Sequence, residues 1–501
     1  MAPRRYLIVS DTHLSDVEEH HDGWKRYKSA AFLRDRDLHG LFRRFMDEGQ
    51  PSDELVLVFN GDIFDFCVTT CVPDEPPWPM RRHERTRGLE PSEAKAVWKL
   101  ERILAQHPDF LTALADYVGR GHGLVYVLGN HDHELHWASV QRVLTDAVRE
   151  RVASLGLSCS ESPIRYEPWF FYDAGGLYVE HGHQYDIYSS FPHILSPTAH
   201  LDGEEILALP LGGFSNRYLV SILGFFNPRS TDYICNLPGY FAHWLRYYAF
   251  SRRSILFGWA LGTLMVLVRV MRLRLELWKQ SAPHAEAMVA TALRFGLPWP
   301  SVWQLDQLKP IPIYFRTFRI LREFWLDRVM LAAALLALTG VCLALAPFSP
   351  LVTLAALSLF SLVLVVVYER TVATSGVFTV NEEAPEYARA ITELLPVKVV
   401  VLGHTHQPAF VQLSPDSYFV NTGTWAPMFT WRKWQGPDPC LRHALFVTLN
   451  AGRVDLDLQV LPSDPGDPPS SVIPLTSLEP LGLPGEEEPV ALGEYRRRGR
   501  A

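Results

Sequence analysis

The sequence has little cysteine, and its six cysteines are scattered along 501 residues. Only Cys67 and Cys71 lie close together, so small buried thiols in a reducing compartment are favoured over a disulfide framework or a cysteine-ligated zinc site. An excess of basic residues is also missing, because 55 Asp and Glu side chains outnumber 47 Lys and Arg. Nucleic-acid-binding domains are usually basic, so we expect no nucleic-acid partner.

A secretory signal is absent as well, since no apolar signal region or cleavage site precedes the strand-like residues 6–10. We therefore expect the catalytic part to remain in the cytoplasm. Internal repeats are lacking, and a hydrophobic content of 48% is ordinary for a globular protein. The length allows two or three domains.

Short apolar strands that run directly into polar side chains recur along the chain. Five segments have this design, and in four of them glycine accompanies the polar residues. The polar groups are, in order, Asp11 with His13, Asp62 with Asp65, Asn130 with His131, His181, and His404 with His406. Because α/β proteins place their chemistry at the carboxyl ends of such strands, we expect these side chains to meet at one site.

The residue types in these segments are typical of metal ligands. Carboxylate oxygen, amide oxygen and imidazole nitrogen together favour Mn²⁺, with Fe or Zn²⁺ as alternatives, over Ca²⁺ or structural zinc. Asp62 is expected to touch two ions about 3.5–4 Å apart, as in two-metal phosphate chemistry. The candidate ligands are Asp11, His13, Asp62, Asn130, His181, His404 and His406.

A proton donor is also needed, because two such ions would activate water for attack on a phosphate but would leave the departing oxygen unprotonated. His131 follows the candidate ligand Asn130 and is predicted to be this general acid. Asp65 is predicted to orient its imidazole. His133 and His183, taken singly, are interpreted as ordinary histidines of the core or surface.

Two uncharged apolar runs, 329–346 and 351–368, lie between the segment of His181 and the segment of His404 and His406. Each has 18 residues, about 27 Å as a helix, which approaches the thickness of a hydrocarbon core of about 30 Å. They predict a transmembrane hairpin, with a buried helical pair of a soluble protein as the alternative. Arginines flank the two runs but not the turn between them, so both ends should face the cytoplasm.

Three further segments bear on the membrane. Residues 255–268 are too short for a confident span and are predicted to be interfacial or packed against the hairpin, unless 206–226 forms a partner span. Residues 313–328 alternate aromatics with arginines and suit a helix in the headgroup layer or, alternatively, an ordinary solvated helix. The tail, 461–501, is predicted to be disordered, with a basic end suited to anionic lipid.

The five motifs together resemble the signature of the calcineurin-like metallophosphoesterases. This resemblance implies an α/β fold, a four-layer α-β-β-α sandwich formed by residues 1–190 and 381–460, with 191–380 as a helical, membrane-associated insertion. It also implies two divalent metal ions. One ion would take Asp11, His13, Asp62 and His406, and the other Asp62, Asn130, His181 and His404; His131, backed by Asp65, would be the acid.

Within that family, the sequence around His13, Phe64 and His404 is similar to the UDP-2,3-diacylglucosamine diphosphatases. The expected function is therefore a hydrolase of the inner, cytoplasmic membrane that cleaves a phosphodiester or pyrophosphate. Its substrate would be a lipid-linked or UDP-sugar compound, or a soluble phosphate ester if the hairpin is only an anchor. The alternative is a membrane scaffold that retains the fold and binds without catalysis.

Overall fold

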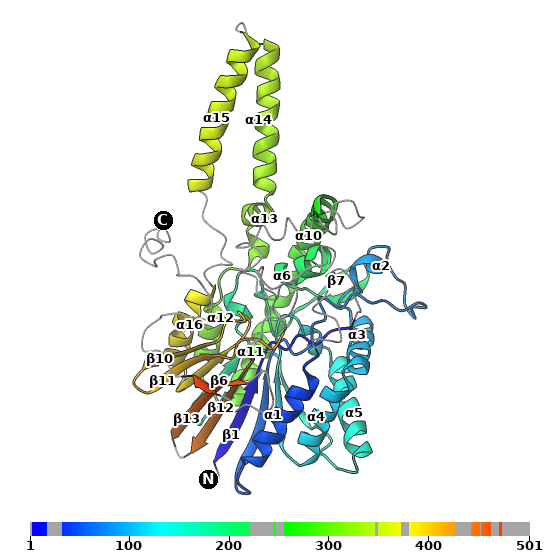
Figure 1. Cartoon of the computed structure of the whole chain (residues 1–501), viewed down its shortest axis with the longest axis vertical. Helices are drawn as coiled ribbons and strands as arrows, with labels where there is room; N and C mark the ends of the chain where they lie inside the picture. The colour runs from blue at the N-terminus through cyan, green and yellow to red at the C-terminus, as the bar shows by residue number, and fades with distance from the viewer. Residues whose placement is uncertain are drawn as a thin grey trace.

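The computed structural model of the chain has a mixed α/β body, from one end of which two long apolar helices project (Figure 1). The prediction of an α/β protein with two added apolar helices is confirmed. The structure describes residues 3–17, 33–220, 245, 255–345, 349–371, 380–426, 442–450, 452–461 and 470–472.

Two β-sheets form the centre of the body. The larger sheet has the order β14-β13-β12-β1-β2-β3-β4, with β1 to β4 parallel and β12 to β14 antiparallel. Its strands are β1 (Arg4–Val9), β2 (Glu54–Asn60), β3 (Gly123–Val127), β4 (Ile164–Glu167), β12 (Arg442–Asn450), β13 (Arg453–Leu461) and β14 (Ser470–Val472). The smaller sheet has the order β10-β11-β9-β6-β5, with β6, β9 and β11 parallel. Its strands are β5 (Phe170–Asp173), β6 (Leu177–Glu180), β9 (Val399–Leu402), β10 (Ala409–Ser414) and β11 (Ser417–Asn421).

Alternation along the strands explains how the sheets pack. Tyr6 and Ile8 of β1 join Val179 and Val401 of the other sheet in one hydrophobic cluster, so these faces meet. Leu7 of β1 points the other way, because successive side chains of a strand lie on opposite faces, and packs in a cluster with helices. Both faces of each sheet are therefore buried, which accounts for the nearly continuous apolar strands.

Helices cover the outer faces of both sheets (Figure 1). Outside the larger sheet lie α1 (Asp35–Asp47), α3 (Glu93–Gln106), α4 (Pro108–Gly119) and α5 (Ala138–Ser154). Outside the smaller sheet lie α11 (Ser281–Phe295), α12 (Trp299–Gln307) and α16 (Val380–Leu394). Ser92 and Glu93 predict the start of a helical region, and the structure divides that region at His107, because Pro108 starts a new helix.

The prolines of the segment 73–91 predict a surface loop, and this prediction is wrong for the second half of the segment. It contains the short helix α2 (Glu84–Arg87), and the residues after this helix are buried. The reason is Glu90, whose carboxylate receives bonds from His83 and Tyr218 and pairs with Arg217 and Arg269.

The described part of the insertion is not purely helical. It begins with the hairpin of β7 (Thr198–Leu201) and β8 (Glu204–Leu207), followed by α6 (Leu211–Ser215) and a π-helix, Asn216–Val220. The described residues of 206–226 therefore do not form a continuous spanning helix, and 221–226 lie outside the described residues. The apolar run at 255–268 belongs to a longer helix, α10 (Ile255–Leu277), one face of which packs against β7, α6 and the π-helix.

The two apolar runs form α14 (Leu326–Leu345) and α15 (Pro350–Thr371), which follow the short helix α13 (Thr317–Glu323). Both are long and apolar enough to cross a membrane, and neither has a buried residue in its described part. Arg328 joins their bases through two bonds, of 2.6 and 2.8 Å, to Glu369. The prediction of a disordered tail is wrong for two parts of 461–501, because Leu461 ends β13 and Ser470–Val472 form β14. Residues 462–469 and 473–501 lie outside the described residues.

Replacing Glu90 by Gln should destabilise the protein. Glu90 is buried and holds Arg217 and Arg269, so its loss leaves buried guanidinium groups without their counter-charge, a change that typically costs about 3–5 kcal/mol. Denaturant unfolding of the full chain at pH 7 measures this difference. Glu93→Gln, on the exposed side of α3, should change stability by less than about 0.5 kcal/mol.

The same variant should show a specific pH dependence. Burial alone would raise the pKa of Glu90, but Arg217, the bond from His83 and Arg269 hold that pKa well below its usual value. Its stabilisation is then complete above the ordinary pKa of about 4.3 and is lost as the pH falls through the lower folded value. The stability gap between wild type and Glu90→Gln should therefore narrow in acid; a gap that widens would contradict this assignment.

Candidate metal centre

The predicted ligands all lie in turns that follow parallel strands. Asp11 and His13 follow β1, Asp62 follows β2, Asn130 follows β3, His181 follows β6, and His404 with His406 follow β9. In Figure 1 the strands β1 and β6 run toward the end of the body from which α14 and α15 project. Two sheets thus contribute their carboxyl ends to one cluster.

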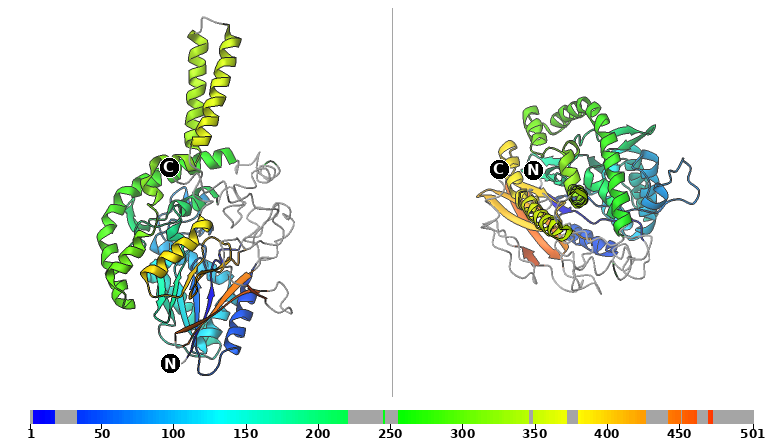
Figure 2. Two further views of the ribbon diagram at one scale, coloured as in Figure 1. Left: turned by 90° about the vertical axis from the view of Figure 1, so that its left-hand side faces the viewer. Right: turned by 90° about the horizontal axis from the view of Figure 1, so that it is seen from above.

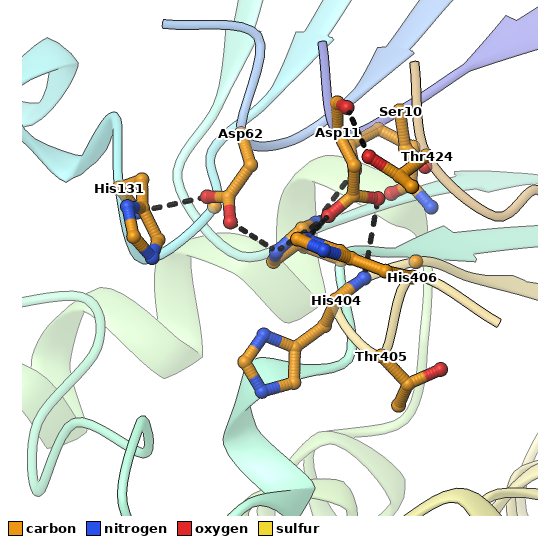
Figure 3. A network of polar contacts seen from close by, with 12 residues as sticks. Ser10, Asp11, Asp62, His131, His404, Thr405, His406 and Thr424 are labelled. Atoms are coloured by element: carbon orange, nitrogen blue, oxygen red, sulfur yellow. Dashed lines mark hydrogen bonds and ion pairs between the residues drawn. The ribbon is translucent and has the colours of Figure 1, made fainter. Parts of the chain in front are cut away.

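The first group of side chains is Asp11, His13, Asp62 and His406. His406 Nε2 lies 3.1 Å from Asp11 Oδ1 and 3.0 Å from His13 Nε2. His13 Nε2 lies 3.8 Å from Asp62 Oδ2. Figure 3 shows Asp11 and Asp62 approaching each other from neighbouring turns, with His406 beside Asp11 and His131 beyond Asp62. Two imidazole nitrogens and two carboxylates thus converge closely enough to share one cation.

The second group is Asp62, His181 and His404. His181 Nε2 lies 3.1 Å from Asp62 Oδ2, while Asp62 Oδ1 accepts a bond of 2.8 Å from the His131 backbone N–H. Asp62 therefore turns a single oxygen, Oδ2, toward the histidines of both groups. Asn130 is buried in the turn after β3, and its Oδ1 has no hydrogen-bond partner among the described residues.

The backbone at the ligands is strained. Within the described ranges, seven non-glycine residues have positive φ, and five of them are predicted ligands. These are Asp11, His13, Asp62, His404 and His406, with φ between 49° and 67°. Left-handed backbone is uncommon for residues with a Cβ, and such residues cluster at functional sites. The positive-φ residues are concentrated in the ligand turns, which indicates that the backbone there is adapted to position the ligand side chains.

The glycines of the motifs are explained by close approach between turns. A Cβ on Gly61 would lie 2.5 Å from the His181 ring, and one on Gly129 would lie 2.2 Å from Asp62 Oδ1. A Cβ on Gly403 would lie 2.7 Å from Asp11 Oδ2. Each glycine leaves room for a ligand of another turn.

Charge in the cluster is balanced by histidine. Burial would raise the pKa of Asp62, but His181, His131 and His13 hold that pKa well below its usual value. Burial would lower the pKa of His181, yet Asp62 and Asp11 raise it to about 9. Asp11 Oδ1 and His181 Nε2 lie 3.1 Å from His406 Nε2 and Asp62 Oδ2, but neither atom has a partner in hydrogen-bond geometry among the described residues. Ligand atoms that converge without satisfying one another fit a site for cations.

His131 and Asp65 form a pair at the side of the cluster. His131 Nδ1 and His13 Nδ1 both lie 2.9 Å from Asp65 Oδ2, but only the His13 contact has the geometry of a hydrogen bond. These three side chains form a third group that could itself hold a metal ion. Burial would lower the pKa of His131, but Asp65 and Asp62 raise it to about 10. The Asp132 carboxylate accepts hydrogen bonds from the Gly129 and Ile63 N–H groups and from the Tyr126 hydroxyl. It therefore connects the turn that carries Asn130 to the turn that carries Asp62.

Two residues beside the cluster were missed by the sequence argument. Asp186 Oδ2 lies 3.0 Å from His404 Nε2, an arrangement typical of carboxylates that orient ligating imidazoles. Asn216 Nδ2 lies 3.4 Å from His131 Nε2 and comes from the π-helix of the insertion. The only local signal for Asp186 was its place five residues after His181, and Asn216 had none.

His133 and His183 are both buried, as expected of core histidines rather than surface ones. His133 Nδ1 lies 3.2 Å from the Gly129 carbonyl, and its ring stacks on Phe191. Both nitrogens of His183 lack a hydrogen-bond partner among the described residues, and its ring centroid is 5.5 Å from that of His181.

Comparison with models of protein families, with curated proteins and with solved structures finds no match to this chain.

Gly129→Ala should abolish metal binding at the cluster. The new Cβ would lie 2.2 Å from Asp62 Oδ1 and 2.5 Å from the Asp62 backbone nitrogen, so the Asp62 turn must move away from the centre of both groups. Metal content after dialysis against Mn²⁺ measures the loss. Gly40→Ala in α1 is the control, since nothing lies within 4 Å of its Cβ and alanine should stabilise the helix by about 0.5–1 kcal/mol. Equal metal content in both variants would contradict the assignment.

Asp186→Asn should weaken metal binding at the group containing His404 by about 10–100-fold, the usual effect of removing such a carboxylate. The asparagine can still accept the 2.9 Å bond from the Tyr188 N–H, so the local turn should persist. Titration with Mn²⁺ measures the change in dissociation constant. Asp416→Asn, an exposed change in the β10–β11 turn, should have no effect, and an unchanged constant in Asp186→Asn would remove its orienting role.

Proposed function

We propose that this protein is a metal-dependent phosphoesterase of the calcineurin-like kind, a hydrolase that cleaves a phosphodiester or pyrophosphate. Two packed sheets with helices on their outer faces suit the four-layer sandwich that the sequence resemblance implies. The predicted ligand turns meet at one edge, as a dinuclear centre requires. Mn²⁺ is the proposed metal, with Fe or Zn²⁺ as alternatives.

The observation that carries the proposal is the position of the His131 and Asp65 pair. A cluster of buried carboxylates and imidazoles by itself would also suit a structural metal. Here a histidine that is not itself a predicted ligand lies beside Asp62, with its Nδ1 2.9 Å from Asp65 Oδ2 and its pKa raised to about 10. An oriented, protonated imidazole next to a metal cluster is what protonation of a leaving oxygen needs.

The chain's residues would then divide the work as follows. Bound metal ions supply the Lewis acidity that neutralises phosphate oxygens and activates the attacking water. Asp11, His13, Asp62 and His406 would hold one ion, and Asp62, Asn130, His181 and His404 would hold the other. Because Nδ1 of His131 lies beside Asp65, Nε2 is the nitrogen that would deliver the proton.

The leaving group would lie on the insertion side of the centre. His131 Nε2 faces Asn216, and Asn216 belongs to the π-helix that packs on α10. A substrate that receives its proton from Nε2 must bring its leaving oxygen to this side. The insertion is therefore the proposed source of substrate specificity.

The two apolar helices favour an amphiphilic substrate, because they would hold the centre close to a membrane. Since α14 and α15 are long and apolar enough to span a membrane, we propose a protein of the cytoplasmic membrane with its catalytic domain in the cytoplasm. A lipid-linked compound or an acylated UDP-sugar would then present its phosphate near the centre.

Hydrolysis by the detergent-solubilised full chain with Mn²⁺ tests the proposal, with bis-p-nitrophenyl phosphate and an acylated UDP-sugar as substrates. We expect turnover that favours the acylated substrate and is abolished in Asp62→Ala. His131→Ala should lower kcat by about 10²–10⁴-fold with metal content unchanged, because a general acid contributes about this much. His200→Ala, an exposed histidine of β7, should retain full activity.

The other outcomes separate the alternatives. Turnover of the small diester alone would keep the phosphoesterase and reduce the hairpin to an anchor. Bound metal without turnover of either substrate would favour the scaffold. Full activity in His131→Ala would keep the hydrolase and remove His131 as its general acid.

A further inference from the structure

The outer face of α10 carries a stripe of exposed apolar side chains. The stripe, called the α10 stripe below, is Leu261, Leu264, Val268, Met271, Leu275 and Trp278, which follows the end of the helix. Their spacing of three and four residues sets them on one face of the helix. Between 46% and 76% of each residue is exposed, which is unusual for six consecutive positions of one face.

The helix that carries the α10 stripe is firmly packed against the body. The opposite face of α10 is buried in the main hydrophobic cluster through Val266, Val270 and Leu273. Arg269 of this face pairs with Glu90. Arg274 binds the Phe315 carbonyl at 2.9 Å, which joins α10 to the segment leading into the apolar helices. The stripe therefore has a fixed orientation relative to the body.

The position of α10 makes the stripe continuous with the two apolar helices. In the views of Figure 2, α10 lies crosswise at the base of α14 and α15, at the end of the body from which they project. Exposed aromatic residues also lie in and just after α13, the helix that leads into α14: Phe318 at 88% exposure and Trp325 at 57%. A bilayer crossed by α14 and α15 would meet this end of the body.

Charge around the stripe suits a membrane surface. Besides buried Arg269, α10 carries Arg272, which pairs with Asp202, and Arg274; Lys279 follows the helix and pairs with Glu276. Arg316, Arg319 and Arg322 lie in and beside α13, where Glu323 is the one acidic residue and pairs with Arg319. Helices that lie in the headgroup layer combine such cationic residues with an apolar face and tryptophan, and anionic lipid attracts their charge.

We propose that α10 lies in the headgroup layer of the bilayer, with the α10 stripe facing the acyl chains. Helices of this type bury their apolar face about 5–10 Å into the boundary between headgroups and chains. The proposal rests on the membrane anchoring in the proposed function but does not depend on hydrolysis. It adds a second contact with the bilayer, which fixes the tilt of the catalytic body above the membrane.

Lipid quenching of a probe on α10 tests this contact. The full chain is reconstituted in nanodiscs that hold one copy, with an environment-sensitive fluorescent amino acid at Leu275 or, as control, at exposed Glu150 of α5. We expect lipids brominated near the glycerol end of the chain to quench the Leu275 probe severalfold more than the Glu150 probe. Aqueous iodide should show the reverse order.

Substitution on the stripe supplies a second measurement. Met271→Asp should markedly reduce bromolipid quenching of a probe at Leu264, because a charge in the acyl layer lifts the helix from the bilayer. Activity on a soluble diester, where the enzyme has any, should stay unchanged and shows that the body is folded; thermal unfolding serves the same purpose if no activity is found.

Two results would overturn the proposal. One is iodide quenching of the Leu275 probe to the same degree as the Glu150 probe, without bromolipid quenching. The other is a blue shift of the Leu275 probe only in nanodiscs that hold two copies, which would make the stripe an interface between copies of the chain.

Discussion

The structure depends on the burial of two carboxylates, Asp11 and Asp62, at the meeting edge of two sheets. Ionised carboxylates out of water are costly unless cations or donors surround them. His181, His13 and His406 gather around these two, and buried ligand atoms nearby remain without hydrogen-bond partners among the described residues. The edge is thus built around negative charge that the protein compensates only in part, which is the physical condition for a site that binds metal ions.

This constraint explains the backbone of the site. Side chains from five strand ends can reach one point only if their turns approach closely, and the glycines beside Asp62, Asn130 and His404 allow this approach. Five ligands also adopt left-handed backbone, which costs free energy at each residue. The cost is offset by the two buried sheets, whose apolar strands hold the turns in position from below.

The sequence predicts the centre well because its signal is local. Each ligand follows a recognisable apolar strand, so strand ends and residue types are enough to group Asp11, Asp62 and His181. Sequence alone could not predict Asp186 or Asn216, whose roles depend on tertiary contacts with His404 and His131. It also could not show that the His131 N–H occupies one oxygen of Asp62, because backbone donors carry no sequence signal.

The insertion was predicted less well for a related reason. Hydropathy identified the apolar run 255–268, but α10 continues beyond it through Arg269, Arg272 and Arg274 to Leu277. Arg269 instead points inward to Glu90, and Glu90 holds Arg217, the neighbour of Asn216 at His131. One helix therefore has an inner face connected to the candidate acid and an outer face of exposed apolar side chains. The contacts of Arg269, Glu90 and Arg217 thus join the inner face of α10 to the side of the centre where we expect the leaving group.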